Sequence, residues 1–211
     1  MKRDLFVTDF WEFDFPYHDK FKKQILDYIT NHPIAKTHIN DNKDINPSLD
    51  SYGGDELDFD AVPELYNFFQ IQTLKLLDNV EKEHSWRKGK WEKPEAWLNV
   101  NLKGNFNPPH IHPSNHYSGC YYVNFPHNSG LIHFLDPRPQ HVIACPELSF
   151  QGDINWYRNK NKYDSSLFTY EVKEGKIVIF PSWLMHYVDP NPTEAMRVSI
   201  AFNARYDNWE R

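Results

Sequence analysis

The sequence predicts an α+β protein whose mainly antiparallel sheet closes into a sandwich or jelly roll. Apolar residues at helical spacing occur only in the first 94 of the 211 residues. After them, short runs of β-branched and aromatic residues alternate with turn residues through residues 95–206. The aromatic share of 16% also favours a sheet-rich core. We expect a single domain, 1–211, because single β domains of this length are common.

Two amphipathic helices are expected in the N-terminal part. The first runs from Tyr17 to Asn31, before Pro33. The second runs from Asp60 to Glu83, with Asp60 as its N-cap and Pro63 in its first turn. We expect both helices to pack on the outside of one sheet. The polar stretch between them, Asn40–Asp60, is expected to form a surface connection.

Seven strands are expected after the helices, with no long helix between them. They are Ala96–Lys103, Ser118–Phe125, Leu131–Leu135, Ile143–Phe150, Leu167–Val172, Lys176–Phe180 and Arg197–Arg205.

Charge and composition exclude several classes of protein. A net charge of -6 disfavours a nucleic-acid partner, because such partners need clustered Lys and Arg. No segment is long and apolar enough to span a bilayer or act as a secretory signal, so we expect no membrane partner and a cytoplasmic location. The two cysteines, Cys120 and Cys145, are too few for a disulfide framework or a zinc ribbon, which fits a reducing compartment.

The stretch NPPHIHPSNHYSG contains three histidines within seven positions. In an extended segment His110 and His112 point to the same side, so both can reach one metal ion. His186, after the strand IVIFPSWLMH, is the candidate third ligand, and His116 is an alternative to His112. The competing interpretation is that these are loop and turn histidines bonded to the backbone.

A triangle of such ligands covers one face of an octahedron and leaves the other face for a co-substrate and O2. This arrangement suits Fe(II). Zinc is less suitable, because it prefers tetrahedral sites and no cysteine ligand is nearby.

The strand RVSIAFNARY places Arg197, Ser199, Ala201 and Asn203 on one face, opposite its apolar residues. An arginine inside a jelly roll needs a carboxylate partner, since an unpaired buried charge is strongly unfavourable. A dicarboxylate co-substrate could be that partner. The alternative is a salt bridge to a neighbouring carboxylate, that of Asp189 or of Glu194.

In the strand SGCYYVNF, Tyr122 shares a face with Ser118, Cys120 and Asn124, opposite Tyr121, Val123 and Phe125. The Tyr122 hydroxyl could donate to the same carboxylate that Arg197 binds.

These motifs, together with GLIHFLDPR and GKIVIFPSWLMHYVDPN, resemble the 2-oxoglutarate/Fe(II)-dependent oxygenases of the prolyl-hydroxylase-like type. The resemblance is closer still to a group of these oxygenases with His-x-His-Pro and Ser-Gly-x-Tyr-Tyr motifs, and it covers residues 95 to 206. It implies a double-stranded β-helix in which His110 and His186 bind iron and Arg197 anchors 2-oxoglutarate. Tyr122 lies at a position where the family often has a tyrosine that contacts the same carboxylate. His112 departs from the pattern, because most relatives have Asp or Glu there.

The resemblance implies an Fe(II)- and 2-oxoglutarate-dependent oxygenase that hydroxylates a C–H bond, with O2 as the second co-substrate. From the resemblance and the residue patterns together, we predict His110, His112 and His186 as metal ligands and Arg197, Tyr122, Ser199 and Asn203 as co-substrate residues. One alternative is a cupin-like three-histidine dioxygenase that uses no 2-oxoglutarate. Another is a non-catalytic jelly-roll module that binds a sugar or peptide on exposed indoles, with Trp156, Trp183 and Trp209 as candidates. In the LDPRP turn, Arg138 either guides an acidic substrate or braces the turn against Asp136.

Overall fold

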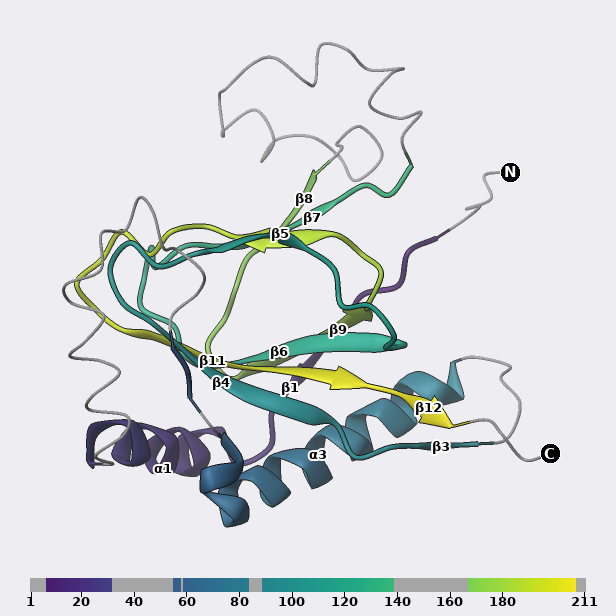
Figure 1. Ribbon diagram of the computed structural model, residues 1–211, viewed down its shortest axis with the longest axis horizontal. Helices are drawn as coiled ribbons and strands as arrows, with labels where there is room; N and C mark the ends of the chain where they lie inside the picture. The colour runs from purple at the N-terminus through teal and green to yellow at the C-terminus, as the bar shows by residue number, and fades with distance from the viewer. Residues whose placement is uncertain (1–6, 32–54, 58, 84–88, 139–166, 208–211) are drawn as a thin grey trace, which may run out of the picture.

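The computed structural model describes residues 7–31, 55–57, 59–83, 89–138 and 167–207. Two antiparallel sheets face each other, and two helices lie beneath the larger sheet (Figure 1). The larger sheet has six strands, in the order β1 (Trp11–Asp14), β9 (Lys176–Pro181), β6 (Tyr117–Asn124), β11 (Arg197–Ala204), β4 (Glu95–Asn101) and β2 (Asp55–Leu57). The smaller has four, in the order β5 (Asn107–His110), β10 (His186–Val188), β7 (Ile132–Leu135) and β8 (Leu167–Tyr170). A two-stranded ribbon pairs β12 (Tyr206–Asp207) with β3 (Lys90–Trp91).

The two long helices cover the outer face of the six-stranded sheet, as the sequence predicts. They are α1 (His18–Asn31) and α3 (Pro63–Lys82). Their apolar faces and the outward side chains of the sheet form one cluster, which includes Phe21, Phe69, Tyr121, Ile200 and Phe202. Among the described helices, none is long and apolar enough to cross a membrane.

The start of α3 differs from the prediction. Val62 occupies the N-cap and offers no side-chain hydrogen bond, while Asp60 lies in a 3₁₀-helix, η2 (Phe59–Ala61). This turn buries Phe59 and moves the helix start to Pro63, so the predicted cap by Asp60 is wrong. Pro63 is tolerated because the first helical position has no intrahelical use for its N–H.

Six of the seven expected strands are present, with ends within two residues of the predicted ones. The seventh, Ile143–Phe150, lies outside the described residues, as does most of Asn40–Asp60. The sequence did not predict β1, β2, β3, β5, β10 or β12, which are all four residues long or shorter. Strand β5 carries two prolines, which a sheet tolerates at an edge, and β5 is an edge strand. His186 was expected to begin a turn, and it begins β10 instead.

Side-chain alternation separates the two faces of β11 as predicted. Val198, Ile200 and Phe202 face the helices, so Arg197 and the residues in step with it face the space between the sheets. Strand β6 behaves alike: Tyr121 packs with the helices and Tyr122 packs between the sheets. Phe125 was predicted beside Tyr121, but it contacts the ring of Tyr122, because β6 ends at Asn124 and the alternation stops there.

The packing around Gly119 explains why the Ser-Gly-x-Tyr-Tyr motif has a glycine at its second position. A Cβ atom there would lie 2.3 Å from the ring of Phe202 and 2.3 Å from the carbonyl oxygen of Val178. Any side chain would therefore push β6 away from its neighbours β9 and β11, which form the floor between the sheets.

Candidate metal and co-substrate site

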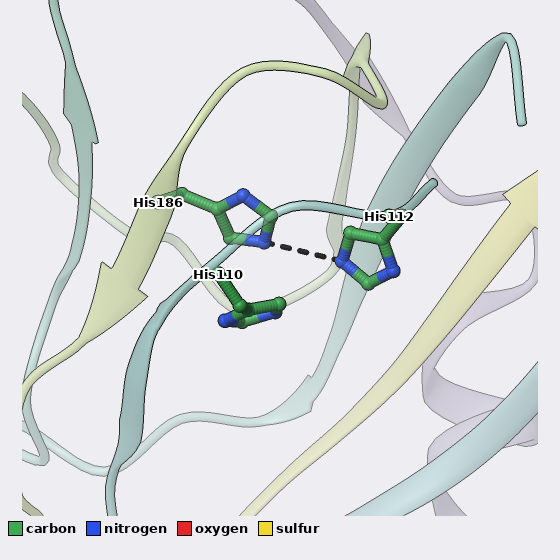
Figure 2. A group of neighbouring side chains, drawn as sticks. All are labelled: His110, His112 and His186. Carbon is green, nitrogen blue, oxygen red and sulfur yellow. Dashed lines mark hydrogen bonds between the residues drawn. The ribbon is translucent and has the colours of Figure 1, made fainter. Parts of the chain in front are cut away.

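Three histidines converge at one end of the four-stranded sheet (Figure 2). His110 ends β5 and His186 begins β10, and the two residues are directly paired. His112 follows two residues later, held by a 2.9 Å hydrogen bond from its backbone N–H to the carbonyl oxygen of Ser182. One nitrogen from each ring lies within 4.8 Å of those of the other two, so the three side chains could hold one metal ion.

Backbone carbonyls fix which nitrogen of two rings is free to bind a metal. His110 Nδ1 lies 2.7 Å from the carbonyl oxygen of Pro108, and His186 Nδ1 lies 2.9 Å from that of Leu184. A carbonyl only accepts, so both Nδ1 atoms carry the proton and both Nε2 atoms present a lone pair. His112 Nε2 lies 3.3 Å from His186 Nε2, close to the roughly 3.0–3.4 Å that separates two nitrogens bound about 2.1 Å from one ion.

Burial keeps two of the imidazoles neutral. It lowers the pKa of His186 to about 3 and that of His112 to about 4, and neighbouring imidazoles add to both effects. Neutral imidazole is the form that binds metals. At neutral pH these rings are therefore ready to bind an ion without first losing a proton.

His116 does not join this group. Its side chain is exposed, and its Nδ1 accepts a 3.1 Å hydrogen bond from the backbone N–H of Tyr206. Within the described ranges, the group that could hold a metal consists of the three histidines and includes no carboxylate. The geometry thus favours His112 over His116.

Arg197 is 3% exposed and faces the space between the sheets. Its Nη1 donates to the carbonyl oxygens of Ser129 and Asp189. Neither salt bridge of the alternative interpretation forms, because the Asp189 carboxylate accepts from His133 and from the backbone N–H of Leu131, and Glu194 pairs with Lys103. The Asp189 carboxylate acts on the guanidinium only through its charge. Among the described residues no carboxylate forms a salt bridge with this guanidinium, and burial lowers the pKa of Arg197 to about 10. The side chain is still charged at neutral pH.

Gly130 makes room for this guanidinium. A Cβ atom at Gly130 would lie 2.6 Å from Arg197 Nη1, and the backbone there has a φ of +95°, which other residues rarely adopt. No local pattern in the chain indicates this role. It depends on a long-range contact between the loop before β7 and the start of β11.

Tyr122 lies beside Arg197, and its hydroxyl is also unsatisfied. The side chain is buried, and its oxygen forms no hydrogen bond of normal geometry. The Cys120 thiol interacts with it, but a thiol is a weak hydrogen-bond partner, and burial raises the pKa of Cys120 to about 11. An unpaired phenol and an unpaired guanidinium nitrogen therefore lie together in the interior.

The interior face of the six-stranded sheet forms the floor of the space between the sheets. Residues paired across β4, β11 and β6 form rows on this floor. Arg197 pairs with Asn101, Ser199 with Asn99 and Tyr122, and Ala201 with Trp97 and Cys120. The Trp97 ring lies 5.9 Å from that of His112, so the third row is next to the histidines. Rows are about 6.7 Å apart, so this row lies about 13 Å along the strand from Arg197.

Ser199 and Asn203 occupy different places along this floor. Ser199 is in the row next to Arg197, between it and the histidines. Asn203 lies six residues from Arg197, about 20 Å along the strand, and its Oδ1 accepts from Ser118. Asn203 is therefore too far to contact the carboxylate that Arg197 would bind.

The described residues of the floor differ in exposure along its length. Arg197, Ser199, Asn99, Asn101 and Tyr122 are buried. The partly exposed residues are Trp97, Cys120, Ala201 and Asn203. The floor residues are therefore buried around Arg197 and partly exposed beside the histidines.

Comparison with known proteins identifies the family. The sequence profile described as "Putative 2OG-Fe(II) oxygenase" matches residues 95–203, more than half of the chain. The chain belongs to this oxygenase family. No curated protein matches the sequence.

Solved structures show the same fold at low sequence identity. One is a Pseudomonas putida prolyl-4-hydroxylase, 15% identical, with 94% of each chain covered and a TM-score of 0.53. Another is HygX from Streptomyces hygroscopicus with nickel and 2-oxoglutarate bound, 13% identical, covering 94% of this chain and 82% of HygX, with a TM-score of 0.56. The expected double-stranded β-helix with helices on one sheet is confirmed.

The structure adds information on two further residues, Arg138 and Trp97. Arg138 binds Asp136 through its backbone N–H and its guanidinium, which supports the bracing role over substrate guidance. The sequence did not single out Trp97 for the site. The sequence indicated only that Trp97 lies in a strand. It reaches the histidines because β4 pairs with β11, where Trp97 is opposite Ala201, and this pairing is not visible in the sequence.

We expect His112→Ala and His186→Ala to reduce Fe(II) affinity by at least about 100-fold, since each removes a ligand. Anaerobic equilibrium dialysis measures this affinity. His116→Ala is the matched control and should bind iron as the wild type does. Loss of iron in His116→Ala, with binding kept in His112→Ala, would instead make His116 the ligand.

The metal-free protein should lose stability as pH falls from about 6.5. Unfolded histidines take up protons near that pH, whereas His112 and His186 in the folded protein do not, so protons favour the unfolded chain. One such imidazole contributes a loss of about 2 kcal/mol between pH 6.5 and 5. Urea unfolding at both pH values should show a smaller loss in His186→Gln than in the wild type, and equal losses would contradict the neutral state.

Proposed function

We propose that this oxygenase binds Fe(II) through His110, His112 and His186 and anchors 2-oxoglutarate through Arg197, and that it hydroxylates a C–H bond of a further substrate. The family membership supports the reaction class. The close approach of the three ring nitrogens supports the ligand assignment.

The observation that carries the proposal is the buried Arg197 guanidinium, which has no carboxylate partner among the described residues. A buried cation without a salt bridge is strongly unfavourable unless a ligand supplies the missing negative charge. 2-Oxoglutarate has one carboxylate for Arg197 and a keto-acid group for the metal. The roughly 13 Å along β11 can be bridged by the arginine side chain, the five-carbon acid and the metal together.

The protein residues hold and orient the reactants. The two backbone-bound histidines keep Nε2 facing the ion, so little reorganisation accompanies metal binding. Arg197 and Tyr122 fix the far end of the co-substrate, and Ser199 lies along its path. Bound Fe(II) with 2-oxoglutarate and O2 supplies the oxidising power that hydroxylation of a C–H bond needs.

Imidazole ligands carry no negative charge, so a site of three histidines leaves both positive charges of the ion uncompensated by the protein. A family member with a carboxylate in place of His112 would neutralise one of them. Here the doubly negative co-substrate is the partner for the ion and for Arg197 alike. We therefore infer that 2-oxoglutarate contributes more to the charge balance of this site than in relatives with a carboxylate ligand.

The two alternatives account for less of the structure. A dioxygenase without 2-oxoglutarate leaves the buried Arg197 guanidinium with no salt bridge to a carboxylate among the described residues. A binding module leaves the convergence of three imidazoles without a purpose. Of its proposed indoles, Trp183 is 54% exposed, and Trp156 and Trp209 lie outside the described residues.

Anaerobic addition of Fe(II) and then 2-oxoglutarate should produce the weak visible charge-transfer band of a keto acid chelated to iron. Arg197→Ala should weaken 2-oxoglutarate binding by at least about 100-fold, since it removes a charge-assisted bidentate contact. Absorbance titration measures both effects, with Arg138→Ala as the control for an arginine outside the interior. A missing band, or an unchanged affinity in Arg197→Ala, would refute the proposal.

A further inference from the structure

Four buried side-chain atoms without a hydrogen-bond partner gather at one place in the described part of the chain. They are Asn101 Nδ2, Tyr122 OH, Ser129 Oγ and Arg197 Nη2. Buried polar atoms are normally paired, so four together require an explanation. Arg197 and Tyr122 are already part of the proposed co-substrate site, whereas Asn101 and Ser129 are not.

Asn101 is the residue directly opposite Arg197 in the β4–β11 pair. Directly opposed residues project from the same face, with Cβ atoms about 5 Å apart. The preceding residue, Val100, packs against the helices, so Asn101 faces the interior. The side chain is 2% exposed, and its amide nitrogen is buried without a hydrogen-bond partner.

Ser129 reaches the same guanidinium from the loop before β7. Its carbonyl oxygen accepts from Arg197 Nη1, and the next residue is Gly130, whose missing side chain leaves room for that nitrogen. Ser129 is fully buried, and its hydroxyl is unsatisfied. Strand β4 and the loop before β7 therefore each place one unsatisfied donor, Asn101 and Ser129 respectively, beside Arg197.

All four atoms can donate a hydrogen bond, and one belongs to a charged group. Leaving buried donors unpaired is unfavourable, so the buried end of the floor around Arg197 favours a ligand that accepts hydrogen bonds from them. A carboxylate fits, because its two oxygens offer about four lone-pair sites and its charge balances the guanidinium.

We propose that Asn101 and Ser129 complete a four-donor receptor for the distal carboxylate of the co-substrate, and that Asn101 sets its selectivity for 2-oxo diacids over 2-oxo monoacids. This inference rests on the proposed function, because it assumes that the keto-acid end is held by the metal. An apolar tail in place of the carboxylate leaves all four donors unsatisfied. A diacid satisfies them, so the receptor discriminates by charge and by hydrogen bonding together.

The test compares 2-oxoglutarate with 2-oxopentanoate, a five-carbon 2-oxo acid that lacks the distal carboxylate. Anaerobic calorimetry on Fe(II)-loaded protein measures both affinities in the wild type and in three variants. Asn101→Leu removes the donor at similar volume. Asn101→Asp keeps the shape but places a carboxylate next to Arg197. Thr73→Val is the control, since Thr73 Oγ1 is also buried and unpaired but lies on α3, away from the floor.

Asn101→Leu should weaken 2-oxoglutarate binding by about tenfold or more, since it removes one hydrogen bond to a charged group. Binding of 2-oxopentanoate should stay within about twofold. Asn101→Asp should weaken 2-oxoglutarate binding further, by about 100-fold, and should also raise the melting temperature of the ligand-free protein, because the introduced carboxylate would pair with Arg197. A purely structural role for Asn101 predicts neither the rise in melting temperature nor the selective loss.

Unchanged 2-oxoglutarate affinity in both Asn101 variants, or equal loss of both ligands, would overturn the inference while leaving the proposed function in place. Loss of 2-oxoglutarate binding in Thr73→Val would also overturn it, because the effect would then not depend on position. Failure of the wild type to bind 2-oxoglutarate would instead refute the proposed function, and the inference with it.

Discussion

The site depends on one unfavourable feature, a guanidinium buried between two sheets with no carboxylate among the described residues to pair with. Carbonyl oxygens of Ser129 and Asp189 hold one nitrogen of Arg197 in place, but they carry no full charge. The fold tolerates this cation because the rest of the interior is well packed: the helices and one face of the large sheet form an extensive apolar cluster. The unfavourable free energy of burying this cation can then contribute to affinity for a diacid.

The two sheets carry different parts of the candidate site. The four-stranded sheet carries His110 and His186 on adjacent strands, and the six-stranded sheet carries Arg197 and the floor on which a co-substrate would lie. Strand β11 lies inside its sheet and is hydrogen-bonded to β4 and β6 on either side, so both neighbours constrain its position. The distance between the three histidines and Arg197 is thus set by paired strands, and precise positioning of a reactant would require such a fixed distance.

Much of this arrangement could be predicted from local patterns. Alternation in RVSIAFN placed Arg197 and Ser199 on the interior face, and the two-residue spacing of His110 and His112 placed both rings on one side. Features that depend on long-range pairing could not be predicted. The β4–β11 register brings Asn101 and Trp97 to the site, and Gly130 matters only because a distant arginine lies against it. The short strand β10 was missed because three residues carry almost no periodic signal.

The central claim is that one diacid binds the metal and Arg197 at the same time, so that metal and diacid must raise each other's affinity. Thermal unfolding of the wild type under anaerobic conditions tests this most directly, alone, with Fe(II), with 2-oxoglutarate, and with both. The account predicts that the rise in melting temperature with both ligands exceeds the sum of the separate rises. Rises that simply add, or no further rise when 2-oxoglutarate joins the metal, would contradict it.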